Sequence, residues 1–335
     1  MSRTLGRIVL VSVAMSTLAL VGCEGVTGSG SAAAGGAGGG TGAGGARASG
    51  GANGSGGASG TGGRAGTGGA TGGSPDADGG TSITGCGAST WPAGDQMYSL
   101  DIGGVSRTYI VGLPSGYNAS KPERLVFAFH GRTGTAMQIA GTGTRGYYGL
   151  RSMMPDTIFV APQGLGTATD PADTGWPNTG GQDIAFVRAM IASLSASYCI
   201  DQGRIFSTGF SYGGIMSHTI ACQMSDVFRA VAPMAGAMFG RPTCVTHPIA
   251  AWMTHGSMDT SASGGVDFSA GQTARDRIVT LNHCQTITTT VGPDPMCVAY
   301  NGCDAGYPVN WCPHTGAHVI PSFAAAGISA FFMQF

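Results

Sequence analysis

The chain has 335 residues, a net charge of −1 and only 10% charged side chains. Because no basic patch or run is present, we expect no nucleic-acid partner. Of the 61 glycines, 27 fall within residues 24–85 without a strict triplet period, which excludes collagen and excludes a globular fold for that part. The remaining residues, 86–335, suffice for one domain with a sizeable core.

The N-terminal segment has the pattern of an export signal. Two arginines precede an apolar run, residues 8–21, that is too short for a comfortable membrane span. Its end, Leu-Val-Gly-Cys at 20–23, resembles a bacterial lipobox. This resemblance implies cleavage before Cys23 and lipidation of its thiol and new amino group; an ordinary signal peptide with a chance cysteine is the alternative. Glu24 favours the outer membrane or cell surface over the inner membrane.

The segment after the cysteine consists mostly of Gly, Ala, Ser and Thr. Such a composition buries almost no apolar surface, so we expect a flexible linker. The predicted organisation is therefore a lipoprotein signal peptide at 1–22, the lipidated Cys23 with a linker at 23–85, and one folded domain at 86–335.

Short apolar segments alternate with amphipathic ones through the folded part. The apolar segments are nearly continuous runs of Val, Ile, Phe and Ala, as in strands covered on both faces. They predict strands at 108–113, 125–129, 157–161, 204–208, 230–233, 249–253 and 287–291. Helices are predicted at 183–197, with Asp183 as N-cap, and at 212–224 and 273–282. The alternation indicates an α/β fold with a mainly parallel central sheet and helices on both faces.

Eight cysteines remain when Cys23 is set aside, and an even number in an exported domain indicates four disulfides. We predict one pair, Cys199–Cys222. Cys199 just precedes a strand of ~23 Å, and Cys222 follows the next turn by a helix of ~16.5 Å, so both should lie near the bottom of one strand–helix unit. Cys244 is the rival partner for Cys222.

A metal site is the alternative use of some of these cysteines. Cys303, Cys312, His314 and His318 lie close together in the sequence and could suggest zinc. No C-x-x-C pair is present, however, and an exported domain favours oxidised cysteines. We therefore expect no metal and no other cofactor.

One predicted strand ends in a pattern that is typical of a nucleophilic serine. Gly209-Phe-Ser211-Tyr-Gly213 follows the strand and fits the G-x-S-x-G nucleophile elbow. In such an elbow the serine occupies a strained turn that projects its Oγ above the sheet, and the small residues let strand and helix approach. The motif alone is weak in a glycine-rich chain, but here a strand precedes it and a helix follows. Ser211 is therefore the predicted nucleophile.

A serine nucleophile needs a base, and the base needs a carboxylate that orients it. In this type of fold the chain order is serine, acid, histidine. Asp259 follows a predicted strand and is the predicted acid, whereas its nearest rival, Asp267, is expected to begin the next helix. His318 is the predicted base and His314 the second candidate. His255 precedes the acid and is expected to pack in its loop.

The negative charge that develops on a carbonyl oxygen needs backbone N–H donors. Tyr212, the residue after the nucleophile, is expected to supply one. The loop after the strand at 125–129 is expected to supply the other, from Arg132 or, next in order, from Thr133. Because a backbone group acts here, the side chain of Arg132 is expected to matter little.

These residues together resemble a known family. The motifs are Phe129-His-Gly131, Gly175-Trp-Pro-Asn178, Gly209-Phe-Ser-Tyr-Gly-Gly214, His255-Gly-Ser-Met-Asp259, Asn310-Trp-Cys312 and Gly316-Ala-His318. They are similar, in the same order, to motifs of bacterial feruloyl esterases and their polyhydroxybutyrate-depolymerase-like relatives in carbohydrate esterase family one. The resemblance covers most of the folded part and implies an α/β-hydrolase fold without a metal. It also implies that the family's serine, acid and histidine are Ser211, Asp259 and His318.

The resemblance implies a serine esterase that works through an acyl-enzyme on hydroxycinnamoyl (feruloyl) esters of plant cell-wall polysaccharide. Trp176 has two equal interpretations: it lines the acyl pocket and stacks on the aromatic acid, or it packs in the core. Acetyl (xylan) esters and polyhydroxybutyrate-type oligomers are the alternative substrates, and an inactive surface binding protein is the remote alternative. We expect a monomer whose partners are the ester substrate and, through the lipid alone, a membrane.

Overall fold

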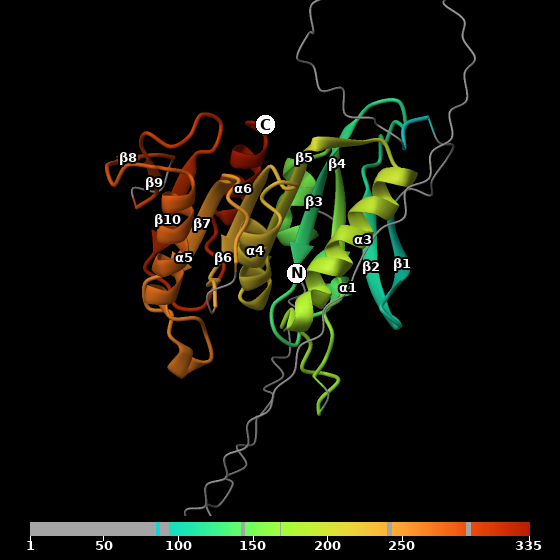
Figure 1. Ribbon diagram of the computed structural model, residues 1–335, viewed down its shortest axis with the longest axis horizontal. Coiled ribbons are helices and arrows are strands. Elements are labelled where there is room, and N and C mark those ends of the chain that lie inside the picture. Colours follow the sequence, from blue (N-terminus) through green and yellow to red (C-terminus); the bar gives the residue numbers. More distant parts are fainter. Residues whose placement is uncertain (1–84, 88–93, 142–144, 168, 240–242, 293–295) are drawn as a thin grey trace, which may run out of the picture. The chain divides into compact units, whose positions relative to one another are not determined.

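The computed structural model describes residues 85–87, 94–141, 145–167, 169–239, 243–292 and 296–335 (Figure 1). All of them belong to one compact unit, Pro75–Phe335. The predicted signal peptide, Cys23 and the predicted linker up to residue 84 lie outside the described residues. None of the helices within the described ranges combines the length and the apolar character that a membrane crossing requires.

A ten-stranded sheet in the order β1-β2-β4-β3-β5-β6-β7-β10-β9-β8 forms the centre of this unit (Figure 1). The strands are β1 (Gly94–Ile102), β2 (Val105–Leu113), β3 (Glu123–Phe129), β4 (Thr157–Pro162), β5 (Ile200–Phe210), β6 (Ala230–Met234), β7 (Ala250–Gly256), β8 (Thr288–Thr290), β9 (Val298–Tyr300) and β10 (Val309–His314). The central strands from β4 to β10 in this order run parallel, and the pairs at both edges are antiparallel. The chain therefore leaves every central strand at the same edge of the sheet.

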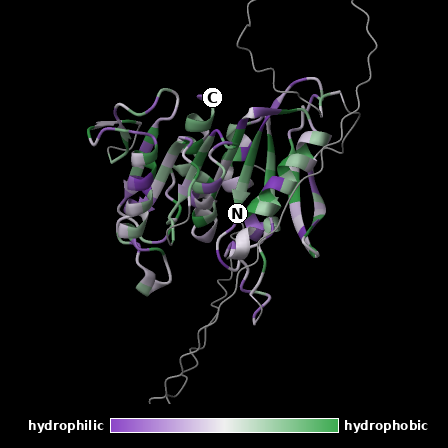
Figure 2. Cartoon of the chain, viewed as in Figure 1, coloured by the Kyte–Doolittle hydropathy of each residue, from purple (hydrophilic) through white to green (hydrophobic). Residues whose placement is uncertain are grey.

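Helices cover both faces of the sheet because the central strands are apolar on both sides. They are α1 (Ala136–Ala140), α2 (Leu150–Met153), α3 (Gln182–Ser197), α4 (Tyr212–Gln223), α5 (Phe268–Leu281) and α6 (Ala324–Phe332), with short 3₁₀ turns at Tyr147–Gly149, Thr179–Gly181 and Ser261–Ser263. In β3, Phe127 and Phe129 pack into the core under α3, α4 and α5, while Val126 and Ala128 pack into the core under α1, α2 and α6. Figure 1 shows α3, α4 and α5 in front of the sheet, and Figure 2 shows its strands as the most apolar part.

The predicted strands and helices are present, although β2 and β5 begin three and four residues earlier than predicted, and three further elements differ as follows. The sixth predicted strand is β7 and runs on to Gly256, so that it includes His255. The last predicted strand, at 287–291, is only the exposed edge strand β8 and not a buried one, because its threonines face solvent. The third predicted helix, α5, begins at Phe268, and its N-cap is Asp267, as expected. The mainly parallel α/β architecture is confirmed.

The prediction of Asp183 as the N-cap of α3 is wrong. The N-cap residue is Gly181, and the polar group that caps the helix is the side chain of Asn178, whose Oδ1 accepts the N–H of Asp183 and of Ile184 at 3.1 Å. The Asp183 carboxylate instead accepts the Asn178 N–H at 2.7 Å and forms a buried ion pair with Arg107 at 2.9 Å. Asp183 therefore ties the helix start to β2.

Four disulfides join the eight cysteines of the domain: Cys86–Cys199, Cys222–Cys244, Cys284–Cys303 and Cys297–Cys312. Such a set indicates an exported protein. The predicted pair Cys199–Cys222 is wrong, and the rival Cys222–Cys244 forms. Cys199 lies beside the start of β3, where Glu123 N–H donates to its carbonyl. Cys222 and Cys244 instead line a pocket together with Leu281 of α5, a helix that packs on β7, on the other side of β5 from β3.

Candidate active site

Three side chains that follow three different central strands meet at the carboxyl edge of the sheet. Ser211 follows β5, and its Oγ is 2.8 Å from His318 Nε2. His318 follows β10, and its Nδ1 is 2.7 Å from Oδ2 of Asp259, which follows β7. Asp259 is buried, whereas the side chain of His318 is 20% exposed. The structure therefore brings the predicted nucleophile, base and acid within hydrogen-bonding distance in the order that a triad requires.

Ser211 lies in a strained turn between β5 and α4. Its backbone has φ 59° and ψ −118°, and its N–H donates to Met234 O at 3.0 Å. A Cβ atom added at Gly209 would lie 2.4 Å from Gly213 O, and one added at Gly213 would lie 2.0 Å from Phe129 O. The two glycines of the motif are therefore required sterically, as the nucleophile-elbow interpretation expects.

The competing candidates have other places. His314 lies on β10, and its Nδ1 accepts the Gly316 N–H at 3.1 Å within the turn that leads to His318. Asp267 caps α5 and accepts the Ser261 N–H at 2.7 Å. His255 was expected to pack in a loop, but it lies on β7, where it contacts Asp259. Sequence reasoning missed this contact, although the four-residue spacing between His255 and Asp259 across a strand end is its signal.

Of the predicted oxyanion donors, two have an N–H for which the described residues offer no acceptor. Tyr212 N–H is the first of α4 and has no partner within the helix. Among the described residues, none accepts a hydrogen bond from Arg132 N–H. Thr133 N–H, by contrast, donates to Thr174 O at 2.9 Å, so Thr133 is wrong as a donor. The Arg132 guanidinium points outward into an ion pair with Asp173, at 2.5 and 2.7 Å.

A buried histidine fixes the loop that carries Arg132. Nε2 of His130 accepts the Gly164 N–H at 2.8 Å, and its Nδ1 is 2.7 Å from Gly131 O. Burial lowers the pKa of His130, so its ring is neutral with the hydrogen on Nδ1. Trp176 Nε1 donates to His130 O at 2.9 Å, and its ring packs edge-on against Phe129. At 2% exposure Trp176 belongs to the core, and its placement in the acyl pocket is corrected accordingly.

A cavity of about 250 Å³ is lined by the two residues that carry these N–H groups. Its lining residues are Arg132, Leu165, Gly166, Thr167, Asp173, Gly175, Pro177 and Tyr212. The ring of Tyr212 forms one wall, and burial raises the pKa of its phenol, which is therefore neutral. Apolar walls with an ion pair at one side suit a planar, weakly polar group.

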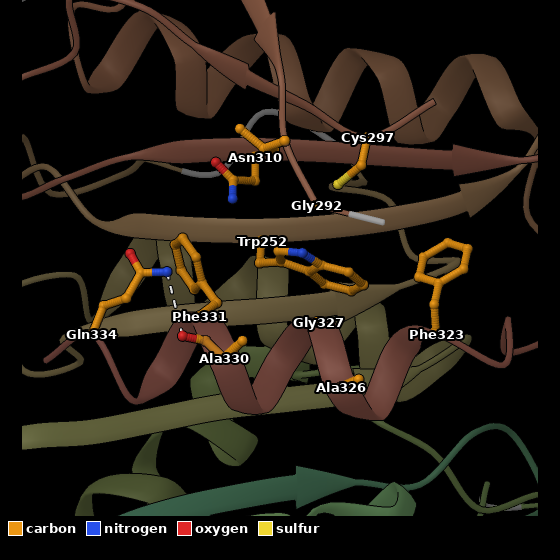
Figure 3. A pocket seen from close by; sticks show the side chains of 11 residues that line it. Trp252, Gly292, Cys297, Asn310, Phe323, Ala326, Gly327, Ala330, Phe331 and Gln334 are labelled. Atoms are coloured by element: carbon orange, nitrogen blue, oxygen red, sulfur yellow. Dashed lines mark hydrogen bonds between the residues drawn. The ribbon is translucent and has the colours of Figure 1, made fainter. Parts of the chain in front are cut away.

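A second cavity, of about 370 Å³, lies away from the triad (Figure 3). It is formed by α6 and the strands β7 and β10, with the indole of Trp252 between the rings of Phe323 and Phe331. None of its lining residues belongs to the triad or to the loop of Arg132, so it has no part in the chemistry at Ser211.

No metal-binding cluster of three or more His, Cys, Asp or Glu side chains occurs within the described ranges. The zinc set considered from the sequence does not exist as such, because Cys303 and Cys312 are each in a disulfide. The polar groups that converge at the carboxyl edge are instead an activated hydroxyl and two backbone donors. This arrangement can add an alcohol oxygen to a carbonyl carbon and stabilise the resulting oxyanion.

Comparison with known proteins finds relatives that are named feruloyl esterases. The chain is 36% identical over 248 residues to "Feruloyl esterase D" of Neurospora crassa, an overlap of 70% of this chain and 81% of the relative. It is 33% identical over 220 residues to "Feruloyl esterase C" of Emericella nidulans, covering 63% and 76%. Residues 153–274 match the model of the prolyl oligopeptidase family; this segment contains Ser211 and Asp259 and ends before His318.

Among solved structures, an acetyl xylan esterase from Aspergillus awamori superposes with a TM-score of 0.55. The superposition covers 72% of this chain and 100% of that one, at 14% identity. At this identity the likeness shows the fold alone, which is the α/β-hydrolase fold.

Proposed function

The chain belongs to the feruloyl esterase family of carboxylic ester hydrolases, and we propose that it cleaves hydroxycinnamoyl esters through Ser211, His318 and Asp259. The observation that carries the proposal is the continuous hydrogen-bonded line from Ser211 Oγ through both ring nitrogens of His318 to Asp259 Oδ2. It provides a nucleophile, a base and an orienting acid without any further group.

In the first half-reaction, Ser211 Oγ attacks the ester carbonyl carbon while His318 Nε2 takes the hydroxyl proton. Asp259 accepts the Nδ1–H and stabilises the imidazolium. The carbonyl oxygen becomes an oxyanion, and the N–H groups of Tyr212 and Arg132 stabilise it. Collapse of the intermediate breaks the bond to the alcohol oxygen, which receives the proton from His318. The products are a free alcohol and an acyl group on Ser211.

In the second half-reaction a water molecule replaces the alcohol. His318 Nε2 takes a proton from the water, and the hydroxide attacks the acyl carbon. The oxyanion forms again at the same donors and collapses, and Ser211 leaves with the proton that His318 returns. The carboxylic acid is released and the enzyme returns to its starting state.

The cavity lined by Tyr212 and Arg132 supports a hydroxycinnamoyl group as the acyl part. Tyr212 and Arg132, the two residues whose N–H groups are proposed to receive the oxyanion, both line it, so an acyl group held at these donors can extend into this cavity. The Tyr212 ring offers a face for an aromatic acid, and Pro177 and Leu165 add apolar walls. The alcohol part, a polysaccharide, then extends away from this cavity.

A substrate comparison tests this proposal. The purified protein is assayed on methyl ferulate, p-nitrophenyl acetate and a hydroxybutyrate oligomer, with the Ser211→Ala variant as control. We expect the highest kcat/KM on methyl ferulate and no turnover by the variant. A preference for the hydroxybutyrate oligomer would reassign the substrate to the polyhydroxybutyrate-type class. A folded wild-type protein that cleaves none of the three esters would favour a binding protein.

We also propose that the protein is anchored to a bacterial envelope through Cys23, with the hydrolase domain at 86–335 separated from the lipid by the glycine-rich linker. The lipobox-like sequence at 20–23 and the linker composition support this. At ~5–6 Å × √n, a coil of 62 residues has an r.m.s. reach of about 40–47 Å, which lets the domain work at a distance from the membrane.

Fractionation tests the anchor. The Cys23→Ser variant is expected to leave the membrane fraction while its kcat on methyl ferulate stays that of the wild type. Radiolabelled palmitate should label the wild type and not the variant. A Cys23→Ser protein that stays with the membrane would contradict the proposal.

A further inference from the structure

A second histidine contacts the carboxylate that orients His318. His255 lies near the carboxyl end of β7, and its side chain is buried. Its Nε2 is 3.2 Å from Asp259 Oδ2, the same oxygen that lies 2.7 Å from His318 Nδ1. Two imidazole rings thus converge on one oxygen atom, whereas the proposed reaction uses only one of them.

The direction of this contact follows from a third group. His255 Nε2 is also 2.8 Å from Val266 O, which can only accept a hydrogen bond. Nε2 therefore carries the hydrogen and shares it between the Val266 carbonyl and the Asp259 carboxylate. Val266 N–H in turn donates to Asp259 Oδ1 at 3.1 Å. Apart from His318, Val266 thus holds Oδ1 of the Asp259 carboxylate and His255 holds Oδ2.

The surroundings keep the ring of His255 neutral and in place. Burial lowers its pKa, and the ionisable groups that act on it are Asp259, His318 and His218 of α4, whose own pKa burial lowers to about 3. A Cβ atom added at Gly271 of α5 would lie 2.2 Å from His255 Nδ1, so the helix packs directly on the ring. Because the His255 ring is neutral, its N–H can hold the Asp259 carboxylate in place without neutralising the negative charge that stabilises the His318 imidazolium.

We propose that His255 is a positioning residue for the ester hydrolysis: its Nε2–H holds the Asp259 carboxylate in the orientation in which Oδ2 meets His318 Nδ1. The inference rests on the proposed triad. Without this donor, Val266 N–H is the one group of the described residues, apart from His318, that holds the Asp259 carboxylate, and the carboxylate can rotate about that single hydrogen bond. A misplacement of about 1 Å in such a relay costs up to about 100-fold in rate.

Two substitutions of similar size separate positioning from packing. His255→Gln places an amide nitrogen close to the position of Nε2, within reach of Asp259. His255→Asn places it close to the position of Nδ1, from which it cannot reach Asp259. Both variants are assayed on p-nitrophenyl acetate, the rates are normalised to active enzyme by the burst of p-nitrophenol, and thermal unfolding is recorded for each.

We expect His255→Asn to lose about 10–100-fold in kcat with KM within about twofold, and His255→Gln to stay within about threefold of the wild type. The acid limb of the kcat/KM profile should move to higher pH in His255→Asn only, because a carboxylate with one donor fewer attracts the imidazolium proton of His318 more strongly. Equal losses in both variants, an unshifted limb, or no loss in His255→Asn would overturn the inference.

If His255→Asn does not fold, His255→Gln decides by itself: kcat within about threefold and a wild-type acid limb support the inference, and a larger loss overturns it. Ser211→Ala separates this inference from the proposed function. A Ser211→Ala protein that keeps wild-type activity overturns the proposed function and this inference with it. An inactive Ser211→Ala protein beside a fully active His255→Asn protein overturns only the role of His255.

Discussion

The ring of Tyr212 lies against the backbone of Gly175, so that a Cβ atom added at Gly175 would be 2.3 Å from Tyr212 Cε1. Gly175→Ala must therefore displace this wall of the cavity, while Tyr212 N–H stays fixed at the start of α4. We expect kcat/KM on methyl ferulate to fall about tenfold or more, and kcat/KM on p-nitrophenyl acetate to fall less. Gly116→Ala is the control, since nothing lies within 4 Å of its added Cβ. An equal fall on both esters would contradict this use of the cavity.

Removal of the nucleophile or the base should abolish turnover. Ser211→Ala and His318→Ala are each expected to lower kcat by ~10⁴–10⁶, because the two groups act as one unit. Steady-state assays on p-nitrophenyl acetate, with circular dichroism to confirm folding, measure this. His314→Ala is the comparison, since His314 holds the turn at Gly316 and not Ser211. A nearly normal His318→Ala enzyme beside a dead His314→Ala enzyme would show that the base is wrongly assigned.

The oxyanion assignment separates the backbone of Arg132 from its side chain. Arg132→Ala removes an exposed ion pair with Asp173 and should change kcat by no more than about fivefold. Arg132→Pro removes the N–H and should cost about 10²–10³ in kcat. The ratio of the two variants in one assay, together with their unfolding temperatures, checks the assignment. Similar rates for a folded Arg132→Pro and Arg132→Ala would exclude this N–H as a donor.

Three buried histidines should make the domain sensitive to acid. Burial lowers the pKa of His130, His218 and His255, to about 3 for His218. Below pH ~6.5 the unfolded chain binds protons at these residues and the folded domain does not, so the free energy of unfolding decreases as the pH falls from 6.5 towards the folded pKa. One such group contributes up to about 1.4 kcal/mol per pH unit.

Urea unfolding at pH 7, 6, 5 and 4 measures this dependence. His218→Met should flatten the decrease between pH 6 and 4. Gly116→Ala, a substitution that adds no titratable group and meets nothing within 4 Å, is the control and should leave the slope unchanged. A His218→Met slope equal to that of the wild type would contradict the buried neutral assignment.

The disulfide between Cys86 and Cys199 closes a segment of 113 residues, and its loss should destabilise without inactivating. Cys86→Ser with Cys199→Ser should lower the free energy of unfolding by about 2–5 kcal/mol. kcat should not change, because Cys199 precedes β5 and Ser211 follows it, at opposite ends of an 11-residue strand. Peptide mapping without reduction should yield a Cys86–Cys199 crosslink; a Cys199–Cys222 crosslink would contradict the pairing.

The central strands could be predicted because burial on both faces leaves a continuous apolar run. β4 is buried at every position and was expected within one residue of its bounds. β1, whose residues alternate between partly exposed and exposed, carries no such run and was missed. β10 was missed as well, since Asn310 and Pro313 interrupt its apolar pattern. Strand prediction thus succeeded where the apolar run is unbroken, and it failed where exposed or polar residues interrupt that run, at β1 and at β10.

The positions of Ser211, Asp259 and His318 could be predicted because a local turn motif and chain order specify them. The cap from Asn178 and the contact of His255 with Asp259 join residues four to six positions apart, so a local signal for them was present but was not used. The occupied N–H of Thr133 could not be predicted, because it depends on where the loop that carries Thr174 arrives. The Cys199–Cys222 prediction failed for the same reason. Strand and helix lengths determine how far along the strand direction each cysteine lies. They do not determine on which side of β5, towards β3 or towards β6, the cysteine lies.

The disulfide between Cys86 and Cys199 also determines the residue at which a mechanical force on the N-terminal part of the chain acts on the domain. Any pull on the chain that precedes Cys86 reaches the folded unit at Cys199, between α3 and β5 in the interior of the sheet. The edge hairpin of β1 and β2, which comes next in the chain, lies outside this path. Stretching the protein from its N-terminus would therefore not peel β1 from β2 while the disulfide is intact. Under reducing conditions the same force would act on β1 first, so the sulfur–sulfur bond protects the hairpin from being peeled apart.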